Sequence, residues 1–155
     1  MIGTQQQPIL RIAGRIILLD PDRHVLLLEH RIDRAAAETV WATPGGGLEG
    51  SETPAQAARR ELSEECGIVV GLADDEVADH TERRVMSFDR VAYDQTDYFY
   101  IVRVAQRPQI AVGHRTELEE LTVLGHRWFS AEDLRASTTR YEPTQLIELI
   151  SGTQR

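Results

Sequence analysis

The chain has 155 residues, a length typical of one domain with a substantial hydrophobic core. Its 25 acidic and 17 basic residues give a formal net charge of −8, which disfavours nucleic acid and membrane surfaces as partners. Every basic residue is arginine, so mechanisms that need a lysine are excluded, and the single cysteine, Cys66, excludes an internal disulfide. Residues 1–8 are polar and predicted to be flexible, and no apolar run is long enough to cross a bilayer, so we expect a cytoplasmic protein.

The first half of the chain predicts a hairpin followed by a glycine-rich connection. Residues 11–19 and 24–31 are apolar and read as two strands, and Asp20-Pro21-Asp22-Arg23 between them has the composition of a turn. Residues 32–39 are predicted to form a loop or a short helix. Residues 41–50 contain one proline and four glycines and are predicted to form a loop.

The next element is a helix over residues 54–66. Thr53 is suited to cap it, Pro54 fits its first position, and Gly67 is expected to end it. Beyond it the pattern predicts strands at 68–72, 77–87, 96–104 and 127–129, a short helix capped by Ser130 and running through Arg135, and a helix at 144–150 opened by Pro143. Because strands and helices alternate, we expect a mixed sheet with helices on its faces.

The predicted helix gathers three carboxylates near its C-terminal end. Glu61, Glu64 and Glu65 lie within about one turn, where they repel each other and oppose the helix dipole. A bound cation would offset both effects, and ligands that are all oxygen suit Mg²⁺ or Mn²⁺ better than zinc. Taken alone, such a group is more often a solvated acidic face, so the surrounding motif decides between the two interpretations.

Residues 46–68 follow a specific pattern: Gly, five residues, Glu, seven residues, then Arg-Glu-apolar-x-Glu-Glu-x-Gly-apolar, with every defining position filled. This pattern resembles the Nudix box of the MutT-like Nudix hydrolase family. The preceding Trp41-Ala42-Thr43-Pro44-Gly45-Gly46 is similar to the family's lead-in, and residues 127–134 are similar to its closing strand and short helix. The resemblance therefore covers most of the chain from residue 11 to about residue 135.

The resemblance implies a single domain over residues 1–155 with the family's α/β/α sandwich around a mixed sheet. It implies hydrolysis of a nucleoside diphosphate linked to another group, by water that Mg²⁺ or Mn²⁺ activates, with a small-molecule nucleotide as substrate. Glu61, Glu64 and Glu65 match the metal-binding positions, and Gly45 matches a position whose carbonyl oxygen is often a further ligand. A homodimer would be unsurprising for the family, although the sequence does not specify one.

Roles for the remaining motif residues follow from the same resemblance. Glu64 is the first choice for the general base and Glu61 the second, while family members differ in which glutamate serves. Glu117, Glu119 and Glu120, upstream of Trp128, are candidates for an extra ligand or base. The residues that match positions of structural support are Gly46, Glu52, Arg60 and Gly67.

For several other side chains the sequence leaves both a functional and a structural role open. Arg31 and Arg34, at the end of the second predicted strand, suit bidentate phosphate contacts or an ordinary polar surface. The aromatic residues Trp41, Tyr93 and Tyr98 suit base stacking or core packing, and packing is the commoner role. Cys66 falls on the apolar side of the helix and is predicted to be an inert buried thiol.

Three hypotheses for the whole chain follow. The first is an active hydrolase of nucleoside triphosphates or related nucleoside diphosphate derivatives. The second is a nucleotide-binding or sensor protein of the same fold with weak or no catalysis, which would have no need to keep three repelling carboxylates. The third is an isoprenoid diphosphate isomerase of this fold, which relies on an added catalytic cysteine that Cys66 is badly placed to supply.

Overall fold

The computed structural model describes residues 7–152 except 33–34, 36 and 112–114. Among them, eight strands form one mixed sheet in the order β5-β6-β1-β2-β3-β8, with β4 paired to β1 and β7 paired to β2. Their bounds are β1 Ile9–Leu19, β2 Val25–Arg31, β3 Thr39–Ala42, β4 Gly45–Gly47, β5 His80–Phe88, β6 Val91–Arg103, β7 Val123–Phe129 and β8 Tyr141–Glu142. The helices are α1 Pro54–Cys66, α2 Glu117–Thr122, α3 Ala131–Ala136 and α4 Leu146–Ser151.

Strand β1 is the centre of the sheet. Along its whole length it pairs in parallel with β6, from Ile9 opposite Tyr93 to Leu19 opposite Arg103. Its other edge pairs antiparallel with β4 in the middle and with β2 at the end, where Leu19 faces Val25. The predicted hairpin β1–β2 is confirmed, and the two strands predicted at 77–87 and 96–104 pair antiparallel as β5 and β6. The parallel pairing leaves no local mark in the sequence because its two strands are far apart along the chain.

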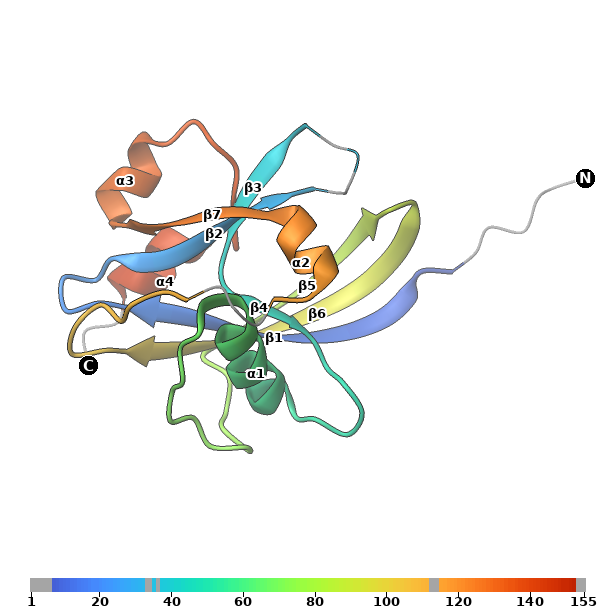
Figure 1. Ribbon diagram of the computed structural model, residues 1–155, viewed down its shortest axis with the longest axis horizontal. Coiled ribbons are helices and arrows are strands. Elements are labelled where there is room, and N and C mark those ends of the chain that lie inside the picture. The colour runs from blue at the N-terminus through green and yellow to red at the C-terminus, as the bar shows by residue number, and fades with distance from the viewer. Residues whose placement is uncertain (1–6, 33–34, 36, 112–114, 153–155) are drawn as a thin grey trace, which may run out of the picture.

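Both faces of the sheet are buried by helices, which confirms the predicted α/β/α sandwich. Alternate residues of β1 point to opposite faces, so Ile16 and Leu18 pack against α1 while Ile17 and Leu19 pack against α3 and α4. Strand β2 divides its apolar residues in the same way. Figure 1 shows α1 on one side of the sheet and the α3–α4 pair on the other. This double burial explains why β1 and β2 are almost continuously apolar.

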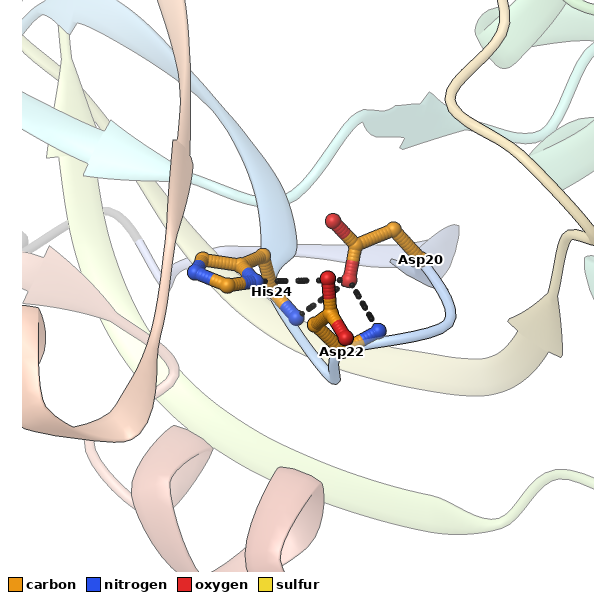
Figure 2. Close-up of side chains that lie close together, drawn as sticks. All are labelled: Asp20, Asp22 and His24. Atoms are coloured by element: carbon orange, nitrogen blue, oxygen red, sulfur yellow. Dashed lines mark hydrogen bonds and ion pairs between the residues drawn. The ribbon is translucent and has the colours of Figure 1, made fainter.

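The turn between β1 and β2 is built around Asp20. One carboxylate oxygen, Oδ1, accepts hydrogen bonds from the backbone N–H groups of Asp22 at 3.0 Å and His24 at 2.8 Å, as Figure 2 shows. The other oxygen accepts one from Arg107 Nε at 2.7 Å. The predicted turn is therefore confirmed, and the buried Asp20 is held by groups on three sides.

Two predictions about the segments that flank α1 were wrong. The glycine-rich stretch predicted as a loop contains the end of β3, which pairs with β2. It also contains β4, because β1 offers a free edge at which Gly45 pairs with Arg15 and Gly47 with Ala13. The strand predicted at 68–72 is absent from the described residues, since Ile68 and Leu72 pack beneath α1 without pairing to the sheet. The apolar character of Ile68 and Leu72 correctly indicated that both side chains are buried, but it wrongly suggested that they belong to a paired strand.

Helix α2 was not predicted, although the sequence carries its signal. Thr116 and Glu119 form a capping box, in which the Thr116 side chain accepts from the Glu119 N–H and the Glu119 side chain accepts from the Thr116 N–H. A threonine followed three residues later by glutamate is the usual sign of such a start. Because α2 is only one and a half turns long, no apolar periodicity accompanied that sign.

Candidate active site

Helix α1 occupies the bounds that the sequence predicts. Thr53 and Gln56 form a reciprocal capping box at its start, and Pro54 follows the cap. At its end Gly67 has φ +68°, a left-handed conformation that glycine adopts without strain, and its N–H donates to Ser63 O. The helix is therefore fixed at both ends, which positions the carboxylates of its last turn.

Three carboxylates from two helices meet beside β4. Oxygens of Glu61, Glu64 and Glu119 lie within 4.8 Å of one another, and all three side chains are half-buried. We call these three residues the acidic group; Figure 1 shows α1 and α2 approaching β4 from different directions. Of the three glutamates predicted as extra candidates, the structure brings Glu119 to this group, whereas Glu117 and Glu120 are exposed on α2.

Glu65 is placed differently from the other two glutamates of the motif. It is buried, and its Oε1 accepts a hydrogen bond of 2.9 Å from the Gly45 N–H, which ties the last turn of α1 to β4. Burial, reinforced by the nearby Glu61 charge, raises the pKa of Glu65 well above its usual range. The motif thus divides into two carboxylates that reach the acidic group and one that anchors the helix. Metal ligation by Glu65 and by the Gly45 carbonyl stays a prediction.

Close approach explains the glycine at position 46. A Cβ atom added there would lie 2.6 Å from the Glu61 carboxyl carbon, a distance that atoms not bonded to each other do not adopt. Glu61 therefore rests directly on the backbone of β4, and a larger residue would displace it from the acidic group.

Arg60 is the cation that the structure places against these carboxylates. Its Nε donates to Glu52 at 2.8 Å and its Nη2 to the Gly47 carbonyl at 2.9 Å. Its Nη1 donates to Glu61 at 3.0 Å and to Glu64 at 3.2 Å. The hydrogen bond from Arg60 lowers the pKa of Glu52. One guanidinium thus joins the loop before α1 to the acidic group.

One arginine does not neutralise the acidic group. Burial and the nearby Glu119 charge raise the pKa of Glu61 to about 7, although Arg60 opposes that shift. Three oxygen ligands from carboxylates, set close together and only partly compensated, form the kind of donor set that Mg²⁺ or Mn²⁺ binds. The residues present therefore fit a divalent cation held by Glu61, Glu64 and Glu119.

The segment that carries Glu119 is fastened to the end of α1. Arg115 Nε donates to the Glu65 carbonyl at 3.0 Å, and the Ala111 N–H donates to the Cys66 carbonyl at 2.8 Å. Both acceptors belong to the last turn of α1, whose carbonyls have no partner within the helix. These two bonds hold the approach to α2 against the end of α1.

A second acidic cluster does not share these properties. Asp20, Asp22 and His24 also lie close enough to hold an ion, as Figure 2 shows. However, both oxygens of Asp20 already accept hydrogen bonds from the turn and from Arg107, and Asp22 is exposed. The cluster is explained by the turn that it forms.

Other predicted residues lie elsewhere. Arg31 ends β2 opposite Thr39, and Arg34 falls outside the described residues, so phosphate binding by either stays a prediction. Trp41 packs edge-on against Phe129, with ring centroids 5.2 Å apart, in the core beneath α3 and α4. Cys66 is fully buried, and burial raises its pKa to about 12, as expected of an inert thiol.

A charged cavity of about 260 Å³, which was not predicted from the sequence, lies between β5, β6, β1 and the segment around β8. Arginines and carboxylates contribute most of its polar lining, and Thr43 lies at its wall. A signal was present, because Arg11 and Arg15 interrupt an otherwise apolar strand at an even spacing that puts both on one face. The principal polar residues of this charged cavity are Arg15, Thr43, Glu82, Arg84, Asp97, Arg140 and Glu142.

In the part of the chain that the structure describes, no helix has both the length and the apolar character needed to cross a membrane.

Two curated proteins match parts of the chain. An octanoyltransferase from Myxococcus xanthus is 46% identical over 54 residues, which is 35% of this chain and 14% of that protein. An RNA pyrophosphohydrolase from Halorhodospira halophila is 43% identical over 68 residues, which is 44% of this chain and 34% of that protein. The matches thus span about a seventh and about a third of those proteins.

Solved structures match nearly the whole chain. A MutT NUDIX hydrolase from Burkholderia pseudomallei superposes with a TM-score of 0.65 at 19% identity, over 90% of this chain and 96% of that one. The E. coli dihydroneopterin triphosphate pyrophosphohydrolase gives 0.64 at 18% identity, over 94% and 97%. At these identities the likeness establishes the fold. The family model of the NUDIX domain matches residues 10–149, and this chain therefore belongs to the NUDIX domain family.

Proposed function

We propose that this protein hydrolyses a phosphoanhydride bond in a nucleoside diphosphate linked to another group, with a divalent cation bound by the acidic group. The observation that carries the proposal is the meeting of Glu61, Glu64 and Glu119 from two helices, where Arg60 pairs with Glu61 and Glu64. Membership of the NUDIX family supports it. Two of the similar proteins are pyrophosphohydrolases by name, one of RNA and one of dihydroneopterin triphosphate.

A cation bound there, Mg²⁺ or Mn²⁺, would neutralise the diphosphate oxygens and lower the pKa of a coordinated water. The reaction forms a bond between water oxygen and phosphorus and breaks the anhydride P–O bond, and the water proton passes to a carboxylate. Glu64 is our first choice for that carboxylate and Glu61 the second. Both lie within reach of Arg60, which orients them, and both stand at the half-exposed end of α1, where a substrate has access.

The substrates we propose are nucleoside triphosphates and related nucleoside diphosphate derivatives. The experiment is a screen for released phosphate and pyrophosphate with Mg²⁺ and with Mn²⁺. The panel contains nucleoside triphosphates, oxidised bases included, together with ADP-ribose, nucleotide sugars and dinucleoside polyphosphates. We expect one compound to react with kcat/KM above about 10⁴ M⁻¹s⁻¹.

The variant that tests the site is Glu64→Gln, which keeps the shape of the side chain and removes its charge. We expect it to lose at least about a thousandfold in kcat/KM while its circular dichroism spectrum stays unchanged. Glu132→Gln, at an exposed position in α3, is the matched control and should react as the unmodified protein does. A folded Glu64→Gln protein with unchanged turnover would refute the mechanism. Tight binding of one compound without turnover would favour a sensor.

A further inference from the structure

The charged cavity adjoins the acidic group across strand β4. Arg15, in its wall, pairs in register with Gly45, and the Gly45 N–H binds Glu65 of α1. Thr43 lies two residues before Gly45 and also lines the cavity. A substrate whose diphosphate contacts the acidic group can therefore extend the group that it carries toward this cavity.

Charges inside the cavity are balanced in an unbroken chain. Arg15 Nε lies 3.0 Å from Asp97 Oδ1, and Arg84 Nε lies 3.2 Å from Asp97 Oδ2. Arg84 also bonds to Glu142, whose other oxygen is 2.9 Å from Arg140 Nη2. Each arginine in the wall is thus paired with a carboxylate, and Glu82, a third carboxylate in the lining, makes the three positive and three negative charges equal. Such a lining presents donors and acceptors together, without the uncompensated positive charge that a phosphate group requires.

One polar group in this wall has no partner. The Thr43 hydroxyl forms no hydrogen bond among the described residues, although the residue is only 1% exposed. Its own carbonyl is satisfied by Arg15 Nη1 at 3.1 Å. Buried hydroxyls are almost always hydrogen-bonded, because an unpaired one loses its interaction with water and gains nothing in return. The unpaired Thr43 hydroxyl is the place where a bound molecule would supply the missing partner.

The size and lining of the cavity limit that molecule. A volume of about 260 Å³ is below the usual range for whole-ligand pockets and suits one ring system. The aromatic ring in the lining, Phe99, is 2% exposed and offers little surface for stacking. Recognition here therefore depends on hydrogen bonds.

We propose that this cavity recognises the neutral polar ring carried by the substrate's diphosphate, and that Thr43 is a specificity-determining residue that hydrogen-bonds to it. The inference rests on the proposed function and deepens it. A nucleobase and a monosaccharide both have the required chemistry, with several donors and acceptors and no charge. A substrate arm that ends in a further phosphate is excluded by the balanced lining.

The test compares Thr43→Val, which keeps the shape and removes the hydroxyl, with Thr43→Ser, which keeps the hydroxyl. Thr81→Val, at an exposed position of β5, is the matched control. Steady-state kinetics are measured with GTP, ATP, UDP-glucose, GDP-mannose and ADP-ribose. For the preferred compound, Thr43→Val should raise KM about three- to tenfold with kcat within about twofold, the loss expected for one neutral hydrogen bond made equally in ground and transition states.

Thr43→Ser and Thr81→Val should retain the KM of the unmodified protein. Preference for a triphosphate would identify the ring as a base, and preference for a nucleotide sugar would identify it as a sugar. An unchanged KM in Thr43→Val for every compound that reacts would overturn the proposal. So would an equal rise in KM for Thr43→Ser, because loss of packing would then explain the effect.

Failure of the proposed function is recognised separately. If the unmodified protein turns over none of these compounds, their binding is measured by calorimetry in the presence of Ca²⁺. Weaker binding of any compound to Thr43→Val than to Thr43→Ser would uphold the cavity as a recognition site without catalysis. Equal binding to both variants, or no binding at all, would overturn it.

Discussion

The acidic group and the charged cavity lie on two sides of β4 and differ in how their charges are compensated. In the acidic group, Arg60 pairs with Glu61 and Glu64, Glu119 adds a third carboxylate, and the pKa of Glu61 rises to about 7. In the cavity, carboxylates alternate with arginines. Burial by itself would raise the pKa of Asp97, but Arg15 and Arg84 hold it below its usual range.

This difference in charge compensation shows what each region lacks. Repelling carboxylates that remain half-buried are costly unless a cation completes them, so the acidic group is incomplete without one. The cavity is already balanced in charge, and the buried side-chain atom of its described lining that lacks a hydrogen bond is the neutral Thr43 hydroxyl. We therefore assign ion binding and chemistry to the first region, and recognition of a neutral ring to the second.

Beyond the loss expected for Glu64→Gln, the largest expected effect comes from the third carboxylate. Glu119→Gln should lower Mg²⁺-dependent kcat/KM about a hundredfold, because an amide is a weaker ligand than a carboxylate and carries no charge. The capping box of α2 should survive, since the glutamine oxygen still accepts from the Thr116 N–H. Glu117→Gln, on the exposed side of the same helix, is the control. Equal activity of the two variants would remove Glu119 from the site.

A smaller effect is expected from breaking the charge balance of the cavity. Arg84→Gln leaves Asp97 and Glu142 with one partner fewer in a buried setting, and should lower the free energy of unfolding by about 2 kcal/mol. Its neighbour Arg83 points outward, with its side chain 72% exposed, so Arg83→Gln should leave the urea midpoint unchanged. Similar midpoints for the two variants would show that the chain of ion pairs contributes no stability.

An effect of similar size separates the two regions by pH. Without metal, the pKa of Glu61 is raised from 4.5 to about 7, so the folded state binds more protons in this range. Stability should therefore decrease, by about 1–3 kcal/mol, as pH rises from 5 to 7. Asp97 and Glu142 have lowered pKa values, so their contribution is present above about pH 4 and is lost below it.

Urea denaturation in EDTA at several pH values should accordingly show maximum stability near pH 5. Mg²⁺, or the Glu61→Gln substitution, should reduce the decrease between pH 5 and 7, to which Glu65 with its raised pKa also contributes, and should leave the loss below pH 4. A metal-free protein whose stability is flat from pH 5 to 7 would contradict the raised pKa of Glu61.

Much of this architecture could be predicted from the sequence, where local signals carry it. The bounds of α1 follow from Thr53, Pro54 and Gly67, and the order of the motif places Glu61 and Glu64 on one face. The apolar runs of β1 and β2 correctly indicate two strands. These features depend on residues that are neighbours along the chain.

What could not be predicted depends on pairing between distant residues. The parallel register of β1 with β6, and β4 as a strand of three glycines, are decided by which edges of the sheet are available. The choice of Glu119 over Glu117 and Glu120 depends on how α2 packs. The charged cavity is lined by residues from five separate segments, so no single sequence motif predicts it.

The bonds from Arg115 and Ala111 to the last turn of α1 have a consequence for cation affinity. The bond between Arg115 and Glu65 joins residues that are 50 positions apart in the sequence. Together with the bond from Ala111, it closes a long loop when the protein folds. The chain entropy that is lost when Glu119 is brought to Glu61 and Glu64 is therefore lost on folding, before any ion binds. Cation association then requires no ordering of the chain, and its full free energy is available to hold the ion.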